Sequence, residues 1–169
     1  MKDIKIAIID MEWTAWKGSA SRNWSLSYEN KEIVQIGFVV TKNLNKILKE
    51  KKLFFKIKKN DLSNFFEILT KIGMSKYHLF AKPFIENLFY MNNVFKDVDK
   101  IFCIGYDGLI LRENIDINKI KIPVFVNKII NIRPFLGKYF KIDDRKIISS
   151  LLPGMVGLRN SNTHHDALG

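Results

Sequence analysis

The sequence predicts an α/β fold in which a mixed five-stranded sheet is flanked by helices. Runs of β-branched and aromatic residues indicate strands, and apolar residues spaced three and four apart indicate helices. The order along the chain is three strands followed by alternating helices and strands. Neither an internal repeat nor a flexible linker divides the 169 residues, so residues 1–169 are expected to form one domain.

The first predicted strand is an apolar run, residues 4–12, which stops at Asp10 and Glu12. Its Ile and Ala residues predict a strand that is buried on both faces. Side chains at positions i and i+2 of a strand point the same way, about 7 Å apart. Asp10 and Glu12 are therefore expected to share one face, where two carboxylates suit a divalent cation. A solvated turn is the alternative interpretation of this pattern.

The next two strands are expected at residues 33–40 and 53–57, after a loop over residues 13–30. Residues 42–52 would connect them, with Asn43 and Asn45 in the turn. Such short connections favour an antiparallel meander for the first three strands.

Helices are expected from residue 62 onwards, where apolar residues recur at three and four positions and Ser63 is a suitable N-cap. A second helical stretch is expected to begin near Ser75 and run past Pro83, which would form either its first turn or a break.

The remaining elements are a strand at residues 100–105, a helix at 109–114 and a strand at 123–127. Short helices at 132–136 and 147–152 would follow. The first, fourth and fifth strands are apolar, which predicts a buried parallel set. Ligands of such sheets gather at the carboxyl ends of the strands.

The composition favours a globular protein that binds polyanions. The chain has 28 Lys and Arg against 17 Asp and Glu, a net charge of +11, and nucleic acid is the commonest polyanionic partner. Its single cysteine, Cys103, excludes a disulfide framework within the chain and favours a reducing compartment. Because no segment approaches the roughly 18 apolar residues that span a bilayer, we expect a cytoplasmic protein with no membrane partner.

Further polar residues fall where the predicted parallel strands end or near the end of the chain. Asp107 follows the fourth strand, which would place it beside Asp10, although a helix N-cap is the alternative. His164 and His165 lie in a polar segment. Paired histidines are commonly solvated, but histidine is also the side chain best suited to proton transfer near neutral pH.

Together these segments resemble the DEDDh 3′-to-5′ exonucleases of the ribonuclease H-like superfamily. Asp10-Met11-Glu12 matches the opening Asp-x-Glu of that family, and residues 32–37 match its Glu-Ile-Val-Gln-Ile-Gly strand. Asp107 falls where the second Asp belongs. Residues 165–169 are similar to the start of the family's His-x-Ala-Leu-x-Asp, a register that selects His165 over His164.

Three departures from the family pattern matter. Lys71 stands where the family usually has Gly, and Ala15 stands where many members have Gly. The sequence ends at Gly169, one residue before the position of the final Asp. The resemblance therefore implies an exonuclease domain truncated before its last motif acid and C-terminal helix, with weak or absent activity expected.

The resemblance implies hydrolysis of DNA or RNA from single-stranded 3′ ends, with release of nucleoside 5′-monophosphates. Asp10, Glu12 and Asp107 would hold two ions, Mg²⁺ or Mn²⁺, which stabilise the attacking and leaving oxygens. His165 would take the proton from the attacking water.

The candidate substrate-binding residues are Trp13, Thr14 and Arg22 in the loop beyond the first acids. Aromatic faces can stack on bases and Arg can bind phosphate. A small aromatic cluster beneath the loop is an equally good interpretation of the tryptophans. The alternative function is a catalytically impaired nucleic-acid-binding module of the same fold, and the alternative enzyme is a two-metal endonuclease. Oligomeric state is open.

Overall fold

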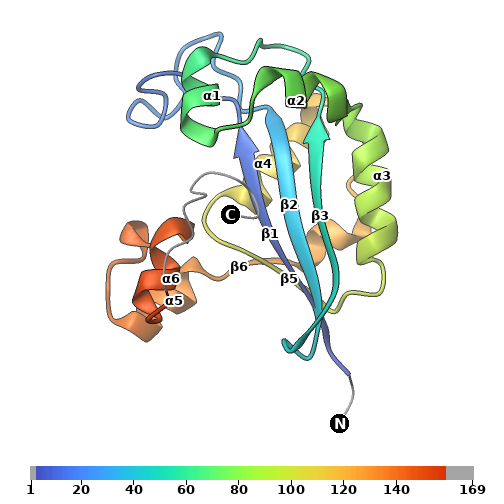
Figure 1. Cartoon of the computed structure of the whole chain (residues 1–169), viewed down its shortest axis with the longest axis vertical. Coiled ribbons are helices and arrows are strands. Elements are labelled where there is room, and N and C mark those ends of the chain that lie inside the picture. Colours follow the sequence, from blue (N-terminus) through green and yellow to red (C-terminus); the bar gives the residue numbers. More distant parts are fainter. Residues whose placement is uncertain (1–2, 159–169) are drawn as a thin grey trace.

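The computed structural model describes residues 3–158 and contains a mixed six-stranded sheet with the order β4-β3-β2-β1-β5-β6 (Figure 1). The α/β fold class predicted from the sequence is confirmed, with the short strand β4 added at one edge. The strands are β1 (Lys5–Trp13), β2 (Ile33–Lys42), β3 (Lys46–Phe55), β4 (Ala81–Lys82), β5 (Lys100–Cys103) and β6 (Ile129–Asn131). The helices are α1 (Asn64–Thr70), α2 (Met74–Phe80), α3 (Phe84–Phe95), α4 (Asp107–Ile117), α5 (Arg133–Phe140) and α6 (Leu152–Met155), with the 3₁₀ turns η1 (Val124–Lys128), η2 (Asp144–Lys146) and η3 (Ser149–Leu151).

Strand β1 lies in the middle of the sheet and pairs on both sides. It runs antiparallel to β2 and parallel to β5, and β5 in turn runs parallel to β6. Strands β2 and β3 form the predicted antiparallel hairpin, with a turn at residues 43–45. The carboxyl ends of β1, β5 and β6 therefore lie at the same end of the sheet.

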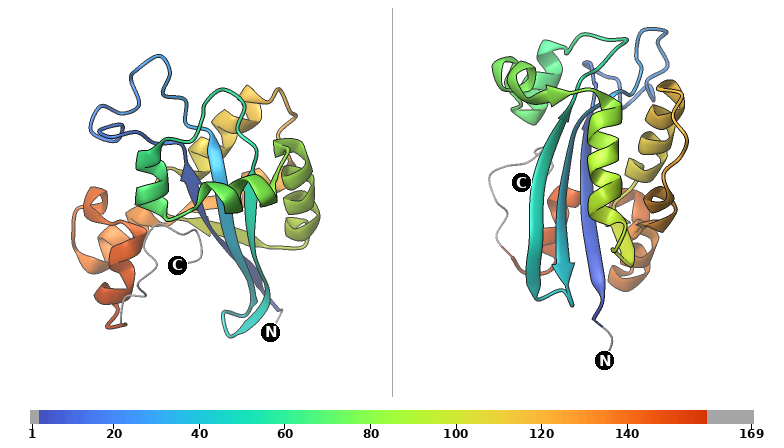
Figure 2. Two further views of the ribbon diagram at one scale, coloured as in Figure 1. Left: turned by 45° about the horizontal axis from the view of Figure 1, so that its top comes forward. Right: turned by 90° about the vertical axis from the view of Figure 1, so that its right-hand side faces the viewer.

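Helices α3 and α4 cover one face of the sheet (Figure 2). From β1, the buried side chains of Ala7, Ile9 and Met11 enter this layer together with residues of both helices. Helices α1 and α2 pack in a second, smaller apolar cluster, which includes Val34 of β2 and Phe54 of β3. The larger core therefore lies on the face of β1 opposite to Asp10 and Glu12.

The expectation that β1 is buried on both faces is wrong. Ile9 and Met11 are 2% and 4% exposed, whereas Ile8 is 50% exposed. Helices α3 and α4 pack on one face only, so β1 alternates between buried and open positions. The high apolar content of the strand concealed this alternation, because Ile8 is apolar on the open side.

The fifth strand was predicted in the wrong place. Residues 124–128 form the turn η1, in which the Val126 amide donates to the carbonyl of Pro123 (3.1 Å). Phe125 and Val126 are buried by this turn rather than by a strand ladder. The strand that pairs with β5 is β6, which ends at Asn131.

Two other boundaries differ from prediction. Strand β3 begins at Lys46 rather than Leu53, because its lysine-rich half pairs with β2 although it is exposed. Pro83 breaks the second helical stretch into α2 and α3, and two-residue β4 lies between them. The predicted N-cap is confirmed, since Ser63 Oγ accepts from the Phe66 amide (3.0 Å).

Within residues 3–158, no helix combines the length and the apolar character needed to cross a membrane.

Lys71 is the C-cap of helix α1 and has a left-handed conformation, with φ of +57°. The Lys71 amide donates to the carbonyl of Glu67 (2.8 Å), which closes the last turn. The turn is thus kept, although Lys occupies a position that favours glycine.

Replacing Lys71 with Gly should stabilise the protein. Glycine removes the steric penalty of the left-handed conformation, so the free energy of unfolding should rise by about 0.5–1 kcal/mol in denaturant titrations. The matched control is Lys138→Gly within α5, which should lower it by about 1 kcal/mol. Equal destabilisation by both substitutions would contradict the strain at Lys71.

Candidate functional site

Two carboxylates lie on the open face of β1 near its carboxyl end. Asp10 is opposite Gly37 of β2, and Glu12 is opposite Gln35. Both acids are half-buried, whereas Met11 between them is buried in the core. The strand alternation therefore puts Asp10 and Glu12 on one face, away from α3 and α4.

The third acid comes from the parallel neighbour of β1. Asp107 is the first residue of α4, just after β5, and is 3% exposed. Tyr106 occupies the N-cap position, and no side chain caps the helix. The N-cap interpretation of Asp107 is therefore not supported. Its Oδ2 atom is buried and has no hydrogen-bond partner.

Electrostatic interactions connect Asp107 with Asp10. Burial raises the pKa of the Asp107 carboxyl well above its ordinary value, and the charge of Asp10 raises this pKa further. The guanidinium of Arg133 acts in the opposite direction. Asp10 and Asp107 are thus close enough to repel each other, as expected for residues at the ends of adjacent parallel strands.

This acid pair fits a divalent cation. A buried carboxylate oxygen without a donor is unfavourable, and a cation would both coordinate it and relieve the repulsion from Asp10. Among residues 3–158, however, no three Asp, Glu, His or Cys side chains are arranged to hold one metal ion. Joint binding by Asp10, Glu12 and Asp107 stays a prediction. His165, the predicted base, lies outside the described residues.

The aromatic residues of the β1–β2 loop form a small cluster. The rings of Trp13 and Trp24 have centroids 6.3 Å apart, and Trp24 Nε1 donates to the Thr14 carbonyl (2.9 Å). The Thr14 side chain is buried, and its hydroxyl donates to the carbonyl of Asn30 and accepts from the amide of Glu32. These contacts support the cluster interpretation, and substrate contact by Trp13 and Thr14 stays a prediction.

Arg22 is held within the same loop. Its Nε donates to Glu29 (3.1 Å), with which it also forms an ion pair, and its Nη1 donates to the Lys17 carbonyl (3.0 Å). Glu29 is buried, and the hydrogen bonds from Arg22 lower the pKa of its carboxyl. Binding of phosphate by Arg22 stays a prediction.

Glu32 has a structural role that the motif alone did not give. Its carboxylate accepts hydrogen bonds from the amides of Lys58, Lys59 and Asn60, at 2.7–2.9 Å. These bonds tie the start of β2 to the segment after β3. Glu32 therefore helps to hold β2, the strand that pairs with β1 at Asp10 and Glu12.

Arg133 was missed by the sequence analysis. It is the first residue of α5, close after the end of β6. Its positive charge acts to lower the pKa of the Asp107 carboxyl. Placing the fifth strand at residues 123–127 hid this relation. With the strand end at Asn131, the parallel topology brings Arg133 to the same end of the sheet as the acids.

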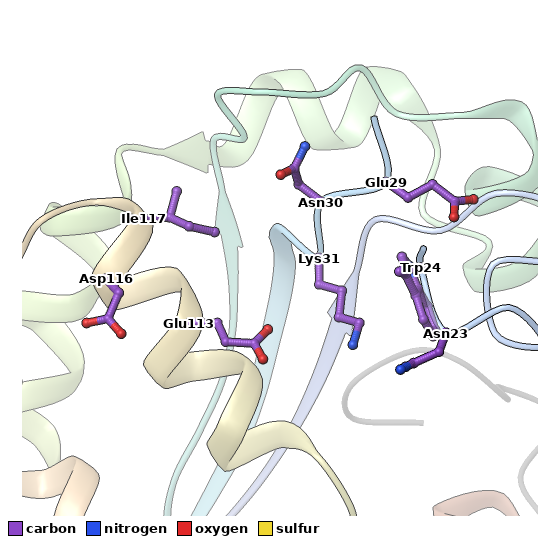
Figure 3. A pocket seen from close by; sticks show the side chains of 8 residues that line it. All are labelled: Asn23, Trp24, Glu29, Asn30, Lys31, Glu113, Asp116 and Ile117. Carbon is purple, nitrogen blue, oxygen red and sulfur yellow. The ribbon is translucent and has the colours of Figure 1, made fainter. Parts of the chain in front are cut away.

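A pocket of about 410 Å³ lies apart from the acid pair, between the β1–β2 loop and α4 (Figure 3). The Lys31 ammonium is 5.2 Å from the centre of the Trp24 ring, and Figure 3 shows Glu113 on the other side of Lys31. The lining residues are Asn23, Trp24, Glu29, Asn30, Lys31, Glu113, Asp116 and Ile117. None of the predicted acids is among them.

No family model and no curated protein matches this sequence, whereas several solved structures are similar to this chain. The nuclease domain of 3′hExo, a DEDDh family member bound to rAMP, has a TM-score of 0.82 at 20% identity, over 97% of this chain and 84% of that one. A 3′-exonuclease recognising the histone mRNA stem-loop has a TM-score of 0.83 at 20% identity, over 97% and 58%. Cell-death related nuclease 4 (CRN-4) has a TM-score of 0.72 at 17% identity, over 96% and 58%.

The chain therefore shares the ribonuclease H-like fold of DEDDh 3′-exonucleases, and the resemblance predicted from its motifs is confirmed at the level of fold. It spans 58% of the length of the exonuclease bound to the stem-loop.

The raised pKa of Asp107 predicts a pH-dependent effect of Asp107→Asn in a chelator. At pH values above about 3.9, the ordinary pKa of Asp, the Asp107 carboxyl loses its proton in the unfolded chain but keeps it in the folded chain until the raised pKa is reached. The stabilising contribution of this group is thus full below about pH 4 and is lost as pH rises towards the folded pKa. At pH 7 the substitution should raise Tm by about 3 °C or more, the shift produced by roughly 1 kcal/mol in a domain of this size.

The matched control is Asp116→Asn, an exposed position on the same helix, α4. It should leave Tm unchanged at both pH values, and the Asp107→Asn difference should vanish near pH 4. Thermal unfolding followed by circular dichroism measures both. A lower Tm for Asp107→Asn at pH 7 would show that the buried carboxylate is stabilising without a cation.

Proposed function

We propose that this chain is a divalent-metal-dependent 3′-to-5′ exonuclease that hydrolyses phosphodiester bonds of single-stranded DNA or RNA and releases nucleoside 5′-monophosphates. The observation that carries the proposal is the acid pair: Asp107 is buried beside Asp10, and its Oδ2 has no hydrogen-bond partner. The fold is the one found in the 3′-exonucleases described above.

In this proposal Asp10, Glu12 and Asp107 hold the metal. Two Mg²⁺ or Mn²⁺ ions, when bound, supply charge stabilisation for the attacking and leaving oxygens. Asp107 contributes a carboxylate in a water-poor environment, where its interaction with a cation is strong. Asp10, on the central strand, interacts electrostatically with Asp107 and would share the same ions.

The remaining parts of the proposal concern proton transfer and substrate binding. His165 would take the proton from the attacking water, since its ordinary pKa near 6.5 suits neutral pH. Trp13, Thr14 and Arg22 would contact the 3′ end, and the net charge of +11 would attract the strand. The buried, unbridged Cys103 supports a reducing compartment, which we propose is the cytoplasm.

A catalytically impaired nucleic-acid-binding module is the second candidate. It is favoured by one observation, namely that no three metal-ligating side chains converge within the described part of the chain. Such a module would bind single strands through its positive charge without cutting them.

The decisive experiment is digestion of 5′-labelled single-stranded DNA and RNA with Mg²⁺, Mn²⁺ or EDTA. We expect stepwise shortening from the 3′ end, mononucleotide products and no reaction in EDTA. Asp10→Asn should reduce the rate by about 100-fold or more, because it removes several kcal/mol of charge stabilisation.

Asp116→Asn, remote from the acid pair on α4, is the charge-matched control and should retain the rate. Cleavage of a circular single strand would identify an endonuclease instead. Salt-sensitive binding without cleavage under either metal would identify the binding module.

A further inference from the structure

We propose that Arg133 binds a phosphate group of the nucleic acid at the acid pair. This inference deepens the proposed function and rests on it for the reaction. The evidence for the phosphate site itself comes from separate contacts, at the start of α5 and in the loop after β5.

Asn131 fixes the position of Arg133. Its Oδ1 atom accepts hydrogen bonds from the Gly105 amide (2.9 Å) and from the Arg133 amide (3.0 Å). One side chain at the end of β6 thus joins the loop after β5 to the first residue of α5. The same loop leads directly into Asp107, so Arg133 and Asp107 are held in one local framework.

Gly105 lets the guanidinium approach the backbone. A Cβ at this position would lie 2.3 Å from Arg133 Nη2 and 2.8 Å from its Cζ, and the φ of Gly105 is +84°. The positive φ favours glycine, and a side chain here would have to displace the guanidinium. Arg133 Cζ is also 5.6 Å from the centre of the Tyr106 ring. The guanidinium is therefore held by its surroundings rather than extended into solvent.

The polar groups of this site are not satisfied by one another. Arg133 Nε is buried without a hydrogen-bond partner, and so is Asp107 Oδ2, although the two side chains interact electrostatically. Buried polar atoms of this kind are uncommon in folded proteins. A guanidinium presents planar donors that match phosphate oxygens, whereas the Asp107 carboxylate suits a cation. A phosphodiester with its metal would satisfy both.

The competing explanation is that Arg133 is only the counter-charge that makes burial of Asp107 tolerable. In that case its removal would change stability but not the affinity for phosphate. The two explanations therefore differ in binding measurements made without catalysis.

The test uses the full chain carrying Asp10→Asn, which removes turnover and one repulsive charge, and a fluorescent oligothymidylate in EDTA. Arg133→Gln should weaken binding about 10-fold, because the charge-assisted pair of hydrogen bonds to phosphate is lost. Arg133→Lys should weaken binding about 3-fold, because this pair is reduced to one hydrogen bond. The slope of log affinity against log salt should become shallower by about one for Arg133→Gln.

The matched control is Arg145→Gln, which removes the same charge from an exposed side chain paired with Asp143. It should change affinity less than about two-fold, as expected for a surface charge outside the binding site. Tm is measured for every variant. If Arg133→Gln does not fold, Arg133→Lys decides, and parental affinity for that variant would overturn the proposal.

The outcomes separate this inference from the proposed function. Equal affinities for Arg133→Gln and Arg145→Gln would overturn phosphate binding by Arg133, even if the parent chain digests 3′ ends. Loss of affinity in Arg133→Gln alone would support it, even if no metal activates the parent chain and the exonuclease proposal fails.

Discussion

The alternation of β1 is the constraint on which the site depends. This strand is paired on both sides, and its odd-numbered residues Ile9 and Met11 are buried under α3 and α4. Because side chains alternate strictly, burial of these residues places Asp10 and Glu12 on the opposite face. A slip of one residue would bring both carboxylates into the apolar core, so the stability of the fold enforces the position of the acids.

Asp107 depends on a different support, the packing of α4. Ile110, Leu111 and Ile115 are buried in the main core. Asn114 accepts a hydrogen bond from the Ile33 amide (3.0 Å) and donates to the carbonyl of Lys31 (2.7 Å), which anchors the helix to the start of β2. This apolar and polar anchoring holds a buried carboxylate near Asp10 in spite of their repulsion.

Sequence patterns predicted an element well where the pattern lies within a short stretch of the chain. The β1 strand, the Ser63 cap and most of the order of helices and strands follow from short stretches of sequence, and the structure contains them, apart from the added β4 and the displaced fifth strand. Burial and pairing are not local. The lysine-rich half of β3 is exposed and pairs with β2, whereas Phe125 and Val126 lie in a turn and pack in the same core as residues of α3 and α4.

The site was predictable to the same extent. Asp10, Glu12 and Asp107 stand at strand ends that the sequence reveals. The bonds of Thr14 and Arg22 within their loop, and the contact of Arg133 with Gly105, join residues that only the folded chain brings together. Arg133 was hidden for a further reason, since its place follows from the true end of β6.

The only cysteine of the chain makes motion at this site open to chemical measurement. Cys103 ends β5 and is buried; burial raises the pKa of its thiol to about 11, and the charge of Asp107 adds to the effect. In the closed sheet the group is thus protonated and shielded, and therefore unreactive towards alkylating reagents. Modification requires β5 to separate from its surroundings, so the rate of thiol labelling reports local unfolding beside the acids. A cation or a nucleic-acid strand that binds and stabilises this end of the sheet would slow that labelling. The labelling rate would therefore measure occupancy of the acid site without any turnover.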